Sequence, residues 1–114
     1  MTVTELSQLV GAKIVCGNSD SRLQIEKAFA SDLMSDVLTV ETEKMLLITG
    51  LANTQTIRTA EMSDISCIMF VRGRKITPEM ITLAGESGIT LLECPGSMFK
   101  TSGILYGAGI KPVF

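Results

Sequence analysis

Three apolar runs of strand length dominate the middle of the chain, and each ends in a glycine turn. They occupy residues 45–50, 67–73 and 90–96, and two segments of helical length, 53–63 and 77–87, separate them. Short continuous apolar runs are typical of strands that are buried on both faces. Spacers of this length provide the crossover connections that parallel strands need. The pattern therefore predicts an α/β fold of three layers, α/β/α, around a mostly parallel central sheet.

The flanking segments carry weaker signals of the same kind. Thr2 and Glu5 have the spacing of a capping box and predict a helix that runs to about residue 10. Residues 13–17 then predict a short strand, and the alternation over 24–30 predicts a half-buried strand at a sheet edge. Residues 111–114 form an apolar tail to which no element is assigned.

Capping residues indicate where further helices begin. Ser31 and Asp32 together, Asn53, Thr77 with Pro78, and Ser97 are the expected N-terminal caps. The helix after Asn53 is expected to bury Ile57, Ala60 and Met62 or neighbours of these. Turn residues at 18–21 and a solvated connector at 41–44 complete the expected organisation.

Length and charge narrow the class of protein. The chain has 114 residues, which predicts one domain over 1–114 that can bury a core without disulfides. The net charge is -2 and the basic residues are scattered, so we expect neither a nucleic acid nor a membrane as partner. There is no histidine, which excludes histidine-dependent catalysis and histidine metal sites. Three dispersed cysteines and the lack of signal-peptide features at the N-terminus favour a cytoplasmic location.

The candidate binding residues follow the three central strands and one flanking strand. In an open parallel sheet, ligands bind at the carboxyl ends of strands, where helix N-termini present free amides. The residues that the pattern brings to these ends are Asp32, Gly50, Asn53, Arg72, Gly73 and Ser97. Tight turns and helix caps are the commoner explanation of such residues, and a solvated loop is the commoner explanation of the basic cluster 72–75.

Catalytic and metal-binding groups are not apparent in the sequence. Cys94 lies at a strand end near a helix N-terminus, where a thiol pKa can fall, but a small buried apolar residue is its commoner role. The carboxylates form no recognisable metal pattern. We therefore expect no catalytic residue, no metal and no cofactor.

The chain also resembles a known family over nearly its whole length. The resemblance is carried by the segments 3–7, 30–34, 46–50, 68–73 and 97–101, whose apolar and turn residues resemble those of the DRTGG domain family. This family is similar to the N-terminal domain of HPr kinase/phosphorylase and has no established catalytic activity. The string Asp-Arg-Thr-Gly-Gly is absent here, and both the loop after Gly50 and the loop at Arg72 and Gly73 are possible counterparts of it. The resemblance implies a regulatory or assembly module that forms homodimers.

Three hypotheses about function follow. The first is a non-catalytic regulatory or ligand-sensing module, a homodimer that binds a small anionic ligand or nucleotide at the strand ends. The second is a structural subunit of a redox assembly of the hydrogenase type, with the tail 110–114, Met34 and Leu38 as interface candidates. The third, and the weakest, is a thiol-dependent enzyme that uses Cys94, because no general base is apparent.

Overall fold

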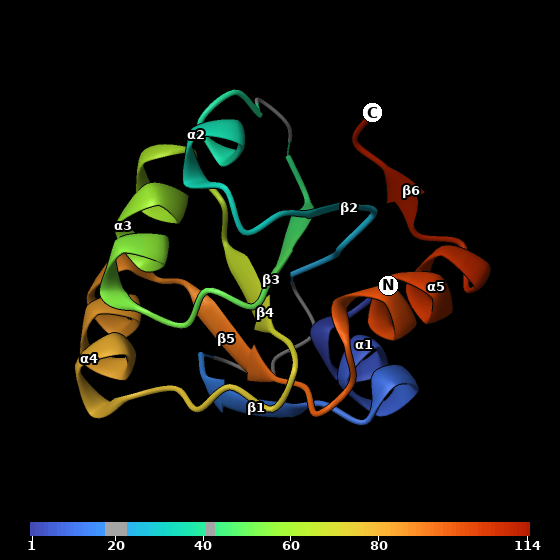
Figure 1. Cartoon of the computed structure of the whole chain (residues 1–114), viewed down its shortest axis with the longest axis horizontal. Helices are drawn as coiled ribbons and strands as arrows, with labels where there is room; N and C mark the ends of the chain where they lie inside the picture. The colour runs from blue at the N-terminus through green and yellow to red at the C-terminus, as the bar shows by residue number, and fades with distance from the viewer. Residues whose placement is uncertain (18–22, 41–42) are drawn as a thin grey trace.

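A six-stranded sheet crosses the middle of the protein, with helices on both faces (Figure 1). The computed structural model describes residues 1–17, 23–40 and 43–114. The turn expected at 18–21 and the first half of the connector expected at 41–44 lie outside these described residues. Three layers around a mostly parallel sheet confirm the fold class that the pattern of apolar runs predicts.

The strands follow the order β1-β5-β4-β3-β2-β6 across the sheet. Their bounds are β1 Lys13–Cys16, β2 Lys27–Ala30, β3 Met45–Thr49, β4 Cys67–Phe70, β5 Thr90–Glu93 and β6 Lys111–Pro112. All neighbouring strands are parallel except β1, which runs antiparallel to β5 at one edge. The carboxyl ends of β2, β3, β4 and β5 therefore lie side by side at one end of the strands. We call this side of the sheet the carboxyl edge, which is distinct from the outer strands β1 and β6.

The helices form two groups. Their bounds are α1 Val3–Val10, α2 Met34–Val37, α3 Thr54–Met62, α4 Pro78–Ser87 and α5 Met98–Gly107. The first group, α2, α3 and α4, covers one face of the sheet, and the second group, α1 and α5, covers the other (Figure 1). Within the described residues, none of these helices has the length and apolar character needed to cross a membrane.

The central strands supply side chains to both layers. All five residues of β3 and all four of β4 are buried. Leu47 and Ile68 pack with α3 and α4, whereas Leu46 and Met69 pack with α1 and α5. Successive strand residues point to opposite faces, so a strand covered on both sides has to be apolar at every position. This is the reason that these strands are continuous apolar runs in the sequence.

Most of the expected helix starts are confirmed. Thr2 and Glu5 form the capping box of α1, and the side chains of Asn53, Thr77 and Ser97 cap α3, α4 and α5. The cap expected from Ser31 and Asp32 is wrong. Leu33 occupies the N-cap position of α2 without a side-chain cap, and Ser31 Oγ instead accepts a hydrogen bond from the Leu33 amide at 3.0 Å.

Two further expectations need correction. The apolar tail forms β6, which pairs in parallel with β2. The strand expected within 24–30 is therefore not at the edge of the sheet, and it begins only at Lys27. In α3, Ile57 and Ala60 are buried as expected, but Met62 is 75% exposed and Thr59 is buried instead. A strand of two residues is too short for an alternation of apolar and polar side chains to reveal it in the sequence. It forms here because β2 is beside it to pair with.

Candidate functional site

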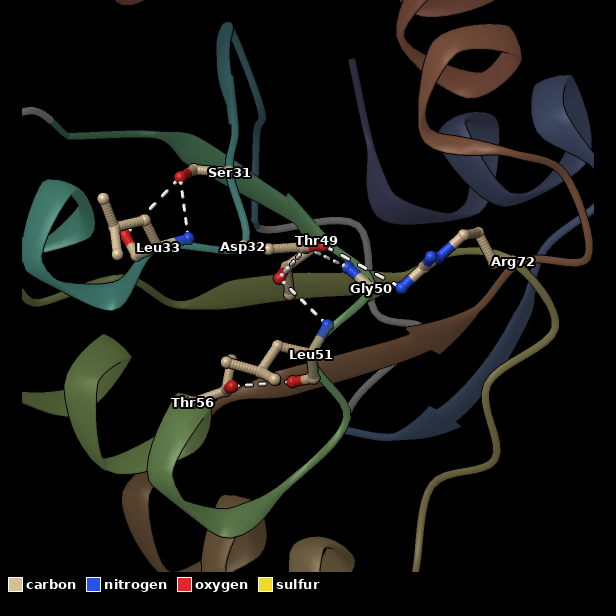
Figure 2. A network of polar contacts seen from close by, with 8 residues as sticks. All are labelled: Ser31, Asp32, Leu33, Thr49, Gly50, Leu51, Thr56 and Arg72. Atoms are coloured by element: carbon tan, nitrogen blue, oxygen red, sulfur yellow. Dashed lines mark hydrogen bonds and ion pairs between the residues drawn. The ribbon is translucent and has the colours of Figure 1, made fainter.

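Asp32 connects the ends of two neighbouring strands at the carboxyl edge. It lies two residues after the end of β2, and its Oδ1 accepts a hydrogen bond from Thr49 Oγ1 at 2.9 Å and from the Gly50 amide at 2.7 Å (Figure 2). Thr49 is fully buried, and its hydroxyl in turn accepts a hydrogen bond from the Leu51 amide at 3.2 Å. Asp32 thus provides the acceptor that a buried hydroxyl requires.

Arg72 also lies at the carboxyl edge, after β4, the strand beside β3. It follows β4 with a left-handed backbone (φ 64°), as does Gly73 (φ 68°). The Arg72 amide donates to the Gly96 carbonyl at 2.8 Å and the Gly73 amide to the Cys94 carbonyl at 3.1 Å. These two backbone bonds fasten the loop after β4 to the loop after β5, and they hold Arg72 in a conformation that costs a non-glycine residue about 1–2 kcal/mol.

The Arg72 side chain lies on the backbone of Gly50. A Cβ atom added at Gly50 would be 2.7 Å from Arg72 Nη2, so only glycine allows the guanidinium to lie here undisturbed. From this position Nη2 is 3.9 Å from Asp32 Oδ2 (Figure 2). The two charged side chains are about half exposed, with 49% of the Arg72 and 48% of the Asp32 side-chain surface open to solvent. They form an open, charged site at the ends of three strands.

Asn53 and Ser97 are mainly helix caps. Asn53 Oδ1 accepts hydrogen bonds from the amide of Thr56 at 2.9 Å and from its hydroxyl at 3.1 Å. Ser97 Oγ accepts from the Lys100 amide at 3.0 Å. Both side chains are therefore directed to their own helices. Their helix N-termini nevertheless belong to the carboxyl edge, because α3 follows β3 and α5 follows β5.

The structure thus divides the six expected site residues. Side-chain contact joins Asp32, Gly50 and Arg72, whereas Gly73, Asn53 and Ser97 adjoin this group through the backbone. The sequence analysis missed Thr49. A hydroxyl residue that ends an otherwise apolar strand just before a glycine was the available signal, because a fully buried hydroxyl needs a partner.

The cysteines are placed for packing. Cys94 is 1% exposed, and its Sγ lies 3.6 Å from the Val10 carbonyl and 3.4 Å from Thr101 Oγ1. Burial raises the pKa of Cys67 to about 12. A protonated, enclosed thiol is a poor nucleophile. Among residues 1–17, 23–40 and 43–114, no group of histidine, cysteine, aspartate and glutamate side chains could hold a metal ion.

The fold is that of an α/β domain with a mostly parallel sheet, and its candidate site lies at the carboxyl edge. The family to which such a domain belongs follows from its sequence. The DRTGG domain family matches residues 5–108, and the chain belongs to this family. No curated protein is similar enough to the sequence to count as a match. The resemblance stated from soft apolar and turn motifs is thereby confirmed.

A solved structure has the same fold. It is the crystal structure of the CBS and DRTGG domains of the regulatory region of Clostridium perfringens pyrophosphatase, in complex with its activator diadenosine tetraphosphate. The TM-score is 0.70 with 16% sequence identity, and the match covers 98% of this chain and 48% of the other. At this identity the likeness concerns the fold alone, and this chain spans about half the length of that structure.

Proposed function

We propose that this chain is a non-catalytic regulatory module, one domain over 1–114, that binds a small anionic ligand at the carboxyl edge of its sheet. The observation that carries the proposal is the position of Arg72. Its guanidinium lies on Gly50, where the loops after three strands converge, and about half of its side chain is open to solvent. Guanidinium groups bind phosphate and carboxylate through paired hydrogen bonds.

The surroundings of Arg72 support the same proposal. Arg74 and Lys75 are exposed on the same loop. The N-cap of α3, Asn53, comes three residues after Gly50, and the N-terminus of this helix adds the partial positive charge of its free amides. The solved DRTGG-containing structure belongs to a regulatory region with a nucleotide activator, which favours a ligand-sensing role for this family member too.

A binding experiment tests the proposal. The probes are a panel of nucleotides, sugar phosphates and organic acids, and the readouts are thermal unfolding and calorimetry. We expect at least one probe to raise the midpoint of unfolding by mass action, and Arg72→Ala to abolish the shift. Arg58→Ala is the matched control, because Arg58 is exposed on α3 and lines a surface hollow with Glu79 and Glu86 of α4 that includes none of the site residues. A shift that Arg72→Ala leaves intact, or no shift with any probe, contradicts the proposal.

We also propose that the module associates with a second copy of itself. Phe99 and Tyr106 are 90% and 70% exposed on α5, and Phe114 at the end of the tail is 82% exposed. Large exposed aromatic side chains are enriched at interfaces. Light scattering over a range of concentrations should give the dimer mass, and Phe99→Ser with Tyr106→Ser should give the monomer mass. A monomer at all concentrations contradicts self-association.

The alternative of a structural subunit in a redox assembly would share only Phe114 with the residues proposed for self-association. Of its expected interface residues, Phe114 and Leu38 are exposed, but Ile110 is 5% exposed and belongs to the core beside α5. A stable monomer that co-purifies with a redox enzyme from its host would favour this alternative over self-association.

A further inference from the structure

We infer that the ligand of the carboxyl edge carries a hydroxyl or amino hydrogen beside its anionic group, as a nucleotide or sugar phosphate does, and that it contacts Asp32 and Arg72 together. This inference rests on the proposed function and narrows the class of ligand. It disfavours oxyanions that carry no hydrogen at neutral pH, such as sulfate, as the ligand.

The two carboxylate oxygens of Asp32 have different partners. Oδ1 accepts both hydrogen bonds that the carboxylate makes to the loop after β3. Oδ2 has Arg72 Nη2 as its nearest partner in the described part of the chain, at 3.9 Å, which is beyond hydrogen-bonding distance. A carboxylate oxygen can accept two hydrogen bonds. Oδ2 therefore retains the capacity to accept a hydrogen bond from a ligand.

The guanidinium of Arg72 has the opposite capacity. It carries five N–H donors and no acceptor. The backbone amide of Arg72 is hydrogen-bonded to the Gly96 carbonyl. Among the described residues, the only polar contact of the Arg72 side chain is the long ion pair with Asp32. A donor group and an acceptor oxygen thus lie side by side, 3.9 Å apart and half exposed. A ligand with an acceptor next to a donor complements both.

The charge of Asp32 exceeds what the internal hydrogen bonds require. Thr49 and Gly50 need one acceptor oxygen, and the amide oxygen of an asparagine would supply it equally well. The half-exposed ion pair with Arg72 adds little to stability. The negative charge and the second oxygen are therefore the features of Asp32 that the fold itself does not explain.

The same charge selects among anions. An oxyanion that binds Arg72 Nη2 from the side facing Asp32 also lies close to Asp32 Oδ2, because these two atoms are 3.9 Å apart. Its repulsion from the carboxylate then offsets part of its attraction to the guanidinium. A ligand hydroxyl that donates to Oδ2 offsets the repulsion, since it gives the carboxylate a hydrogen bond in place of water. The binding of polyhydroxy phosphates gains from Asp32, whereas the binding of sulfate, which has no hydrogen to donate, is weakened by it.

The variant Asp32→Asn separates the repulsion of an oxyanion by Asp32 from the hydrogen bond that Asp32 accepts from a ligand hydroxyl. Its amide oxygen keeps the acceptor for Thr49 and Gly50, and its amino group replaces the charged acceptor Oδ2 with a neutral donor. Calorimetry on the full chain would compare sulfate with AMP and ribose 5-phosphate. We expect Asp32→Asn to weaken the binding of the tighter organic phosphate about tenfold and to strengthen the binding of sulfate. Asp36→Asn, an exposed position on α2, should change neither.

The outcomes are distinct. If Asp32→Asn strengthens the binding of both kinds of ligand alike, or if wild-type protein binds sulfate as tightly as the organic phosphates, the inference is wrong while the anion site stands. If Arg72→Ala leaves organic phosphate binding unchanged, or if nothing in the panel binds, the proposed function fails and the inference fails with it. Thermal unfolding of each variant without ligand confirms that the comparison concerns folded protein.

Discussion

The interior of the sheet and its carboxyl edge are built by opposite means. In the interior, β3 and β4 are buried at every position, and two helical layers press on them from both sides. At the carboxyl edge, three loops are held by a few polar contacts around Asp32, Gly50 and Arg72. The interior depends on the amount of apolar surface that is buried, whereas the edge depends on single atoms in single positions.

This difference predicts where the protein tolerates change. Non-directional burial spreads its free energy over many neighbours, so interior substitutions should mainly alter stability. A few directional contacts contribute less to stability but determine where a guanidinium or a carboxylate lies. Substitutions at the edge should therefore alter geometry and binding more than the free energy of unfolding.

Leu47→Ala should have the largest effect on stability. Leu47 is fully buried in β3 between α3 and the sheet. Removing its side chain leaves a cavity, and we expect a loss of about 3 kcal/mol in the free energy of unfolding. Denaturant titration measures it, with Leu9→Ala, which is 43% exposed on α1, as the control. A loss below about 1 kcal/mol would mean that the interior is not packed as described.

Cys67 tests how strictly the interior excludes charge. Burial raises the pKa of its thiol from 9.0 to about 12 in the folded protein. The folded state therefore keeps a proton that the unfolded chain loses, so this contribution to stability is complete below pH 9 and is lost as the pH rises towards 12. The expected slope is about 1.4 kcal/mol per pH unit between these values.

The slope needs a reference, because lysine and tyrosine side chains also titrate in this range. Cys67→Ala removes the thiol and leaves those groups unchanged. Unfolding in denaturant at pH 9, 10 and 11 should show wild type losing stability more steeply than Cys67→Ala. Parallel curves for the two proteins would place Cys67 in contact with water and contradict its burial.

Asp32→Ala should cost less than the interior substitution. It removes the acceptor for the buried Thr49 hydroxyl and for the Gly50 amide. An unsatisfied buried hydroxyl costs about 1–2 kcal/mol, and we expect a loss of that size. Asp32→Asn should retain most of the stability, because its amide oxygen can accept the same two bonds. If alanine and asparagine are equally destabilising, the charge of Asp32 matters to the fold and the contrast between edge and interior is weaker than argued.

The same contrast explains which features could be predicted from the sequence. Burial on both faces dictates an apolar residue at every strand position, so β3, β4 and β5 are visible as runs, and caps such as Thr77 mark their helices locally. The contact of Asp32 with Gly50 spans 18 residues, and that of Arg72 with Asp32 joins different strands. No local period encodes such pairings. The residues were therefore foreseeable as a set at one edge, and Thr49 could have been noticed as a hydroxyl residue that ends an apolar strand, but its pairing with Asp32 could not be predicted.

The smallest expected effect concerns the backbone of Arg72. Its φ of 64° lies in the left-handed region, which glycine occupies without steric cost. Arg72→Gly and Arg72→Ala both remove the guanidinium, so their difference isolates the backbone. The left-handed conformation costs alanine about 1–2 kcal/mol, and the greater freedom of glycine in the unfolded chain offsets about 0.4–1 kcal/mol of it. We expect the glycine variant to be more stable than the alanine variant by about 0.5–1 kcal/mol in thermal or denaturant unfolding. Equal stabilities would mean that the loop relaxes once the side chain of Arg72 is gone. The turn would then owe its left-handed form to the guanidinium on Gly50 and not to the two backbone bonds to the loop after β5.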